Sequence, residues 1–178
     1  MKVVIIHGNG GSTADHNWIP WLREELEKKN IRVIAPTMPD NVEAKGSIWL
    51  PYMHNELKCD ENTVIIGHSS GAVAAMRYAE QHKLLGSILV GACYTDLGAQ
   101  SEGISGYYDK PWLWNNIKSN QKWIIQLASI DDPYIPIEEA HHIHKNLGSE
   151  YHEFSNQGHF QAKDIPSVLS LLLSKLTK

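Results

Sequence analysis

A serine, an aspartate and a histidine stand in the sequence at spacings that favour nucleophilic catalysis. Ser69 lies in the stretch GHSSG, which fits the pattern G-x-S-x-G. In that pattern a strand turns sharply into a helix and lifts the serine hydroxyl above a sheet. Ser70 has the bulky His68 and Ala72 in the positions of the two glycines, so it is the poorer candidate. The pattern predicts Ser69 as the nucleophile, and the alternative is that Ser69 or Ser70 only caps a helix.

A serine hydroxyl needs a base, and in folds that use this turn the partners follow in the order serine, acid, histidine. His159, in the stretch NQGHF, comes just after the last expected strand, where a glycine permits a tight turn. The stretch SIDDPYIP follows the fifth expected strand and supplies Asp131 and Asp132. Asp132 is preferred because it directly precedes Pro133, which ends the strand. We therefore predict a triad of Ser69, Asp132 and His159, with Asp131 as the alternative acid.

Backbone N–H groups are needed to stabilise the negative charge that develops on the substrate oxygen. One is expected from Ser70, directly after the nucleophile. The second is expected from HGNGG, residues 7–11, which follow the first expected strand; Asn9 is the preferred donor and Gly10 the alternative. This loop does not bind a dinucleotide phosphate in the usual way, because Thr13 stands where G-x-G-x-x-G requires glycine.

These residues must be positioned by a sheet and its covering helices. Short runs rich in β-branched residues alternate with amphipathic stretches, which is the pattern of a parallel sheet with crossover helices. The expected strands are residues 3–7, 32–36, 63–67, 87–91, 123–129 and 150–154. The expected helices are residues 18–29, 48–58, 70–83, 136–147 and 163–176. The carboxyl ends of parallel strands share one edge of the sheet, where the predicted triad would meet.

The connection at residues 92–122 has no obvious helix of its own and is rich in aromatic residues. Long connections in compact domains are usually functional or form partly ordered lids, so this one is the candidate lid over a substrate cleft. The alternative is that its aromatic side chains cover the edge of the core. For substrate binding we expect an open cleft lined by some of Tyr107, Tyr108, Trp112 and Trp114.

Length and composition limit the class of protein. The 178 residues suit one domain, residues 1–178, and the net charge of −4 with scattered basic residues gives no surface for nucleic acid. The longest apolar run near the start is too short for a signal peptide or a membrane span. Cys59 and Cys93 have no paired spacing, which favours free thiols in a reducing compartment. We expect a cytoplasmic protein that binds neither nucleic acid nor membrane.

Two short motifs admit other interpretations. The stretch HHIH, from His141 to His144, contains metal-binding side chains, but it lacks H-E-x-x-H and suits a solvated helix face, so no metal site is predicted. The stretch LKCDE, from Leu57 to Glu61, matches L-x-C-x-E, the motif by which proteins bind the retinoblastoma pocket. A protein-interaction module that binds a retinoblastoma-type pocket is therefore the alternative to an enzyme.

Over nearly its whole length the chain resembles the retinoblastoma-binding protein 9 family of small serine hydrolases. The resemblance is carried by GNGG, SIWLPYM, LKCDE, IIGHSSGA with AMRYAE, GYYDKPW, DDPYIP and GHF. The family's triad falls on Ser69, Asp132 and His159. His7 stands where animal members tend to have proline, and this difference leaves the triad unaffected.

Together these observations predict the α/β class, with an α/β-hydrolase fold of three layers, a six-stranded and mostly parallel sheet of strand order 2-1-3-4-5-6, and a minimal cap or none. The predicted activity is that of a serine hydrolase that cleaves a small ester, amide or short peptide through an acyl-enzyme. No cofactor is expected.

Overall fold

Six strands form one sheet in the computed structural model, which describes residues 1–176. Every neighbouring pair is parallel and the order is β2-β1-β3-β4-β5-β6, as the sequence predicts. The strands are β1 (Lys2–Ile6), β2 (Val33–Ile34), β3 (Thr63–His68), β4 (Gly86–Val90), β5 (Ile124–Ser129) and β6 (Glu150–Phe154).

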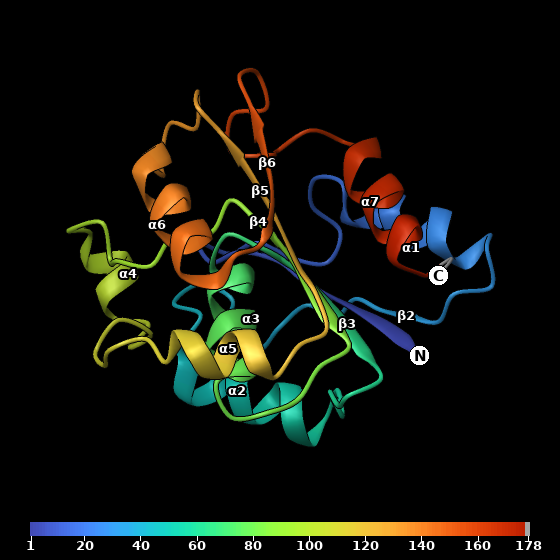
Figure 1. Ribbon diagram of the computed structural model, residues 1–178, viewed down its shortest axis with the longest axis horizontal. Coiled ribbons are helices and arrows are strands. Elements are labelled where there is room, and N and C mark those ends of the chain that lie inside the picture. Colours follow the sequence, from blue (N-terminus) through green and yellow to red (C-terminus); the bar gives the residue numbers. More distant parts are fainter. Residues whose placement is uncertain (177–178) are drawn as a thin grey trace.

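Helices cover both faces of this sheet and complete three layers (Figure 1). On one face lie α1 (Ile19–Glu27) and α7 (Pro166–Leu176). On the other lie α2 (Gly46–Asn55), α3 (Ser70–Ala79), α5 (Trp114–Ser119) and α6 (Ile137–Leu147). Within residues 1–176, no helix is long and apolar enough to cross a bilayer. The architecture is that of an α/β hydrolase.

The core has two halves because successive side chains of a strand point to opposite faces of the sheet. Val3 and Ile5 of β1 belong to the cluster around Trp18, which packs beneath α1 and α7. Val4 and Ile6 belong to the cluster on the opposite face, beneath α2 and α3. All four side chains are at most 1% exposed. A run of four consecutive apolar residues therefore marks a strand covered on both faces.

The central helix α3 lies unusually close to the sheet. All ten of its residues are buried, and most of them are small. At Gly71 a Cβ atom would lie 2.3 Å from the carbonyl oxygen of Ile6, so only glycine permits this contact with β1. The small residues that follow the G-x-S-x-G pattern therefore allow α3 to pack closely against the sheet. This close packing fixes the position of Ser69, which directly precedes α3.

Several predicted boundaries are wrong by a few residues. The strand expected at 32–36 is only two residues long, because at the sheet edge it pairs with one neighbour, through Val33 and Ile34. The helix expected at 48–58 instead runs from Gly46 to Asn55, and Lys58 has a positive φ of 52°, which no helix contains. The helix expected at 70–83 ends at Ala79.

The connection at residues 92–122 is more ordered than its sequence predicts. It contains the short helices α4 (Gln100–Gly103) and α5. A four-residue helix has too little periodicity to be recognised in a sequence, and α5 has six residues, of which only Ile117 is buried. In Figure 1 this connection lies on the same side of the sheet as α3 and α6.

Candidate active site

Ser69 lies on a strained turn between β3 and α3. Its backbone angles are φ 54° and ψ −120°, in a region that side-chain-bearing residues rarely adopt. The glycines two residues before and after it allow the turn. A Cβ atom at Gly67 would lie 2.3 Å from the carbonyl oxygen of Gly71, and one at Gly71 would be equally close to Ile6. Both glycines of the pattern are therefore sterically required, and the hydroxyl is presented at the carboxyl end of β3.

A cavity of about 420 Å³ opens above this turn. It brings together residues from the loops that follow β1, β3, β4, β5 and β6. The residues that border it are Gly8, Asn9, Gly10, Ser12, Asn17, Val42, His68, Ser69, Cys93, Leu97, Ser101, Glu102, Tyr134, Ile135, His159 and Gln161. The predicted nucleophile and the predicted base thus share one cavity, although 90 positions separate them in the chain.

His159 and Asp132 form a buried hydrogen-bonded pair. The Nδ1 atom of His159 lies 2.7 Å from Oδ2 of Asp132, and their side chains are 8% and 3% exposed. A carboxylate only accepts, so Nδ1 carries the proton and Nε2 is left to act as a base. The other carboxylate oxygen, Oδ1, accepts the backbone N–H groups of Tyr134 and Ile135. These bonds fix the carboxylate behind the imidazole.

Asp131 has a different role from its neighbour. Its Oδ1 accepts a hydrogen bond from the Ser129 hydroxyl and another, of 2.9 Å, from the N–H of Gly158. The bond from Ser129, followed by the bond from Gly158, lowers the pKa of the Asp131 carboxyl below its usual range. The two aspartates therefore have separate structural roles. Asp132 contacts the imidazole of His159, and Asp131 binds the loop that carries His159.

The loop after β1 lies directly against Ser69. A Cβ atom at Gly8 would come within 3.2 Å of the Ser69 Cβ. The N–H of Gly10 donates to the carbonyl of Val42 at 3.0 Å, so it is already engaged. This bond favours Asn9 over Gly10 as the oxyanion donor. The side chain of Asn9 also donates, from Nδ2 to Oε1 of Glu102 at 2.7 Å.

His7 holds this loop in place, a role that its sequence position did not predict. It is 1% exposed, and its Nδ1 lies 2.7 Å from the carbonyl oxygen of Gly8, while its Nε2 accepts the N–H of Met38 at 2.8 Å. Both bonds require the neutral form with the proton on Nδ1, and burial lowers the pKa of His7 accordingly. Because a trans peptide points its C=O and N–H in opposite directions, fixing the Gly8 carbonyl also fixes the N–H of Asn9.

The four aromatic residues expected to line the cleft do not border this cavity in the part of the chain that the structure describes. Tyr107 is 3% exposed and packs in the core against Gly46. Trp112 donates a hydrogen bond from Nε1 to the carbonyl oxygen of Tyr94. The guanidinium carbon of Arg77 lies over the Trp112 ring, 3.6 Å from the centre of that ring. Trp114 stacks on Trp112 at 5.4 Å. The expectation is corrected, because all four aromatic side chains pack in or against the apolar cluster beneath α2 and α3.

Other residues of the same connection form the cleft wall. Cys93, Leu97, Ser101 and Glu102 all border the cavity. Tyr108, one of the four expected aromatics, lies behind this wall: its hydroxyl is 3.1 Å from the Cys93 sulfur and is also bonded to Glu102. Burial raises the pKa of the Cys93 thiol to about 12, so it is protonated at neutral pH. Sequence periodicity could not identify these residues, because Cys93 and Leu97 lie in the loop after β4 and Ser101 and Glu102 lie in α4, a helix of only four residues.

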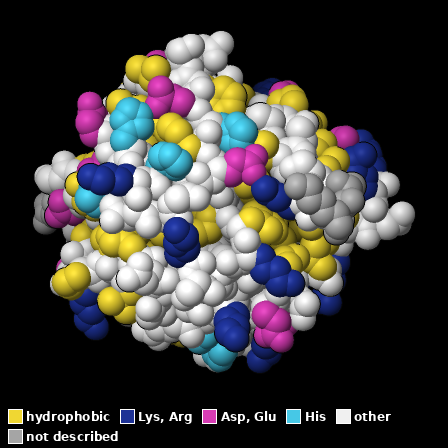
Figure 2. Space-filling view, in the orientation of Figure 1, with side chains coloured by type: hydrophobic (Ala, Val, Ile, Leu, Met, Phe, Trp, Pro, Cys, Tyr) yellow, Lys and Arg dark blue, Asp and Glu magenta, His cyan; other side chains and the backbone are white. Residues whose placement is uncertain are grey.

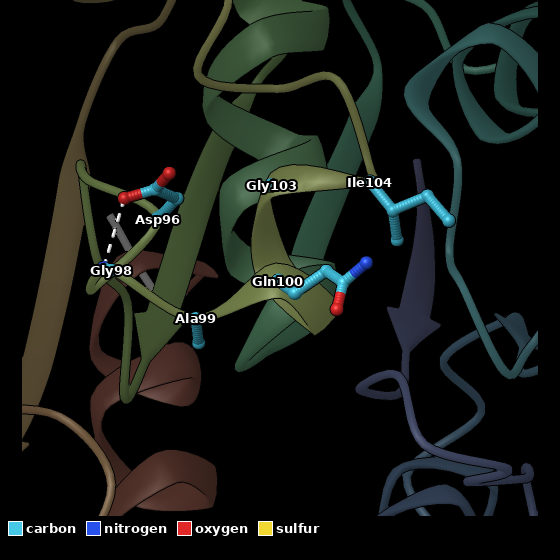
Figure 3. Close-up of a pocket in the computed structure, with 6 residues that line it drawn as sticks. All are labelled: Asp96, Gly98, Ala99, Gln100, Gly103 and Ile104. Atoms are coloured by element: carbon cyan, nitrogen blue, oxygen red, sulfur yellow. Dashed lines mark hydrogen bonds between the residues drawn. The ribbon is translucent and has the colours of Figure 1, made fainter.

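A second hollow lies beside α4 (Figure 3). It measures about 490 Å³ and is bordered by Asp96, Gly98, Ala99, Gln100, Gly103 and Ile104. Its one carboxylate, Asp96, accepts the N–H of Gly98 within its own turn at 2.9 Å. It holds no paired nucleophile and base, and the cavity at Ser69 is the better candidate for catalysis.

The histidines of the HHIH stretch lie on the face of α6. In Figure 2 histidine side chains gather with acidic ones over α6 and β6. His141 pairs with Glu153 at 2.7 Å, and His142 stacks on Tyr94 at 3.8 Å. His144 stacks on Tyr151. Each ring has its own partner, and within residues 1–176 no group of three or more His, Cys, Asp and Glu side chains is arranged to hold a metal.

The LKCDE stretch follows α2 and is folded into the core. Leu57 and Cys59 are 6% and 5% exposed and belong to the apolar cluster beneath α2 and α3. The carbonyl oxygen of Cys59 accepts the hydroxyl of Tyr78 at 2.7 Å. The two side chains that a binding pocket would need therefore face inward, and both would have to leave the core before the motif could bind a partner.

The chain matches the family model for serine hydrolases over residues 3–168. It is 46% identical to the serine hydrolase RBBP9 of Rattus norvegicus over 99% of this chain and 96% of that protein. The solved structure of the ydeN gene product of Bacillus subtilis has a TM-score of 0.89 and 25% identity, covering 99% of each chain. Est1E from Butyrivibrio proteoclasticus, solved with ferulic acid bound, shares the fold at 13% identity, with a TM-score of 0.79 over 99% of this chain and 89% of that one. The chain belongs to the serine hydrolase family.

Proposed function

We propose that the protein hydrolyses a small ester or amide through a triad of Ser69, His159 and Asp132. The observation that carries this proposal is the meeting of Ser69 and His159 in one cavity, with Asp132 bonded to the far side of the imidazole. A nucleophile, a base and a group that orients the base are the three parts that acyl transfer requires. Membership of the serine hydrolase family supports the same chemistry.

In the proposed reaction the Ser69 hydroxyl attacks the substrate carbonyl as Nε2 of His159 takes its proton. The N–H groups of Asn9 and Ser70 stabilise the negative oxygen of the tetrahedral intermediate. His159 then gives the proton to the leaving alcohol or amine, and the acyl group remains on Ser69. Water, deprotonated by His159, attacks the acyl-enzyme, and His159 returns that proton to the Ser69 oxygen as the bond to the acyl group breaks and the acid is released. The buried carboxylate of Asp132 stabilises the imidazolium in both steps.

The substrate is proposed to be a small molecule or a short peptide. A volume of about 420 Å³ is within the usual range for small-molecule sites and holds an acyl group of modest size. The reaction needs no cofactor. We further propose that residues 1–178 act as one domain, and that the free thiols of Cys59 and Cys93 favour a reducing compartment such as the cytoplasm.

Labelling with a fluorophosphonate probe, followed by mapping of the modified peptide, tests this proposal. We expect one adduct, on Ser69, that disappears in Ser69→Ala. Ser70→Ala is a matched control, because the buried Ser70 hydroxyl has no hydrogen-bond partner among residues 1–176 and its loss should be tolerated. That variant should label like the original protein. An adduct on Ser70, or labelling that survives in Ser69→Ala, would contradict the assignment.

A further inference from the structure

The loop that carries the proposed base is held by its main chain. The carbonyl oxygen of His159 lies 2.8 Å from Nε2 of His68, and the carbonyl of the next residue, Phe160, accepts the Trp18 indole N–H at 3.1 Å. On the other side, the N–H of Gly158 donates to Asp131, as described above. Side chains from three separate parts of the chain thus bind three consecutive residues of this loop.

This loop needs such support because it is strained. Phe160 has a φ of 53° although it is not glycine, and its side chain is fully buried. Such a conformation persists only where the surroundings impose it. The main-chain bond from His68 is therefore part of what keeps His159 in place.

His68 is built to donate that bond. It is the last residue of β3, directly before Ser69, and is 4% exposed. Its ring lies 4.9 Å from that of His159 and 5.9 Å from that of Trp18. A carbonyl oxygen only accepts, so Nε2 of His68 must carry the proton. Burial, with a further contribution from the neighbouring His159, lowers the pKa of His68 to about 4 and keeps the ring neutral.

We propose that His68 is a positioning residue, whose Nε2–H holds the backbone of His159 so that its imidazole meets the Ser69 hydroxyl. The inference rests on the proposed function. Asp132 fixes the Nδ1 side of the imidazole, and His68 fixes the main chain that carries it. Because His68 precedes Ser69 in the chain, this single bond joins the nucleophile's turn to the base's loop across 91 positions.

Nitrogen NMR of the histidine side chains tests the bond without any need for activity. We expect His68 to show a protonated Nε2 and a bare Nδ1, unchanged between pH 5 and 8, with its signals assigned by their loss in His68→Gln. A proton on Nδ1 would overturn the proposal, because Nε2 could not then donate to the His159 carbonyl. A ring that titrates within this range would overturn it as well.

Two variants of matched size test the consequence for catalysis. Glutamine at position 68 keeps an N–H donor at a similar reach, whereas methionine has nearly the same shape and no donor. We expect His68→Gln to retain kcat within about threefold, and His68→Met to lower kcat by roughly 10- to 100-fold with little change in KM. Equal kcat in the two variants, whether both high or both low, would overturn the positioning role.

The two proposals fail in different ways. If the original protein gives no fluorophosphonate adduct on Ser69, the proposed function fails, and the NMR measurement still decides whether the His68 bond exists. If the original protein labels and turns over but glutamine does not rescue what methionine loses, only the role of His68 fails. Circular dichroism and thermal melting of both variants confirm that the fold is retained in the comparison.

Discussion

The sheet edge that carries Ser69, Asp132 and His159 differs from the cleft wall formed by residues 92–122 in how its geometry is determined. At the sheet edge Ser69 directly follows β3, Asp132 lies three residues after β5 and His159 lies five residues after β6, so each is close to a strand end. Along the wall, the residues that border the cavity run from Cys93 to Glu102, through turns and into the short helix α4. The position of Ser69 is therefore set by the local geometry of its turn, whereas the position of the wall depends on how side chains distant in the sequence pack in the core.

Mutations in these two regions are therefore expected to have different effects. Changes at the edge should act on the rate of the chemical step, because they move reacting groups. Changes in the wall should act mainly on substrate binding, except where a wall residue contacts the edge. The hydrogen bond from Asn9 to Glu102 is such a contact, and it makes the comparison open to test.

The largest effect is expected from the two adjacent aspartates. Asp132→Asn should lower kcat by roughly 10⁴, because an amide at this position no longer favours the correct tautomer of His159. Asp131→Asn should cost less than about tenfold, because the amide oxygen can still accept the N–H of Gly158. Steady-state kinetics on a chromogenic ester would measure both. Equal losses, with the fold intact, would mean that the two carboxylates cannot be assigned separate roles.

A smaller effect is expected on the stability of the protein at acid pH. The pKa of His68 is lowered from an ordinary value of 6.5 to about 4 by burial, so between these values the unfolded chain binds more protons than the folded one. The free energy of unfolding should therefore decrease as the pH falls from about 6.5 to about 4, by up to roughly 3 kcal/mol. Urea denaturation across this range measures it.

His7 contributes in the same direction, since burial lowers its pKa too. His68→Gln should flatten the pH dependence, because glutamine does not titrate. If the variant and the original protein lose stability in parallel between pH 6.5 and 4, His68 is not the residue responsible.

Loss of the hydrogen bond between Asn9 and Glu102 should have a modest effect on kcat. Glu102→Ala removes the acceptor of the Asn9 side chain and should lower kcat by roughly tenfold, through a looser oxyanion loop. Glu102→Gln replaces the carboxylate oxygen with an amide oxygen that still accepts from Asn9, and kcat should stay within about threefold of the original value. A double-mutant cycle with Asn9→Ala would measure the coupling. If Glu102→Ala changed KM and left kcat unchanged, Glu102 would act on substrate binding and not on the oxyanion loop.

The smallest effect is expected from Trp114. Because it stacks on Trp112 and does not border the cavity, Trp114→Phe should change KM by less than about twofold. Leu97 does border the cavity, and Leu97→Ala should raise KM by roughly 3- to 10-fold through lost apolar contact. Titration of the same ester with both variants compares them. A larger change in KM for Trp114→Phe would mean that Trp114 contacts the substrate.

The parts that the sequence predicted correctly are those set by short-range geometry. The G-x-S-x-G pattern located the turn at Ser69, because two backbone contacts exclude any side chain at Gly67 and Gly71. Apolar runs located the six strands, and the α/β-hydrolase fold implied by the family resemblance predicted their order. The place of Trp112 was predicted wrongly because it depends on Arg77, which lies in α3, far away in the sequence. The choice of Asn9 over Gly10 likewise depends on a bond to Val42 that no local pattern reveals.

The hydrogen bond between Asn9 and Glu102 also bears on how such a protein could evolve. A cleft wall that is separate from the catalytic groups can accept insertions and substitutions that admit new substrates while the rate is preserved. Here the wall residue Glu102 holds the side chain of the proposed oxyanion donor. Changes that reshape the wall near α4 would therefore alter substrate range and turnover together, so new specificities should arise more readily through Leu97, which borders the same cavity.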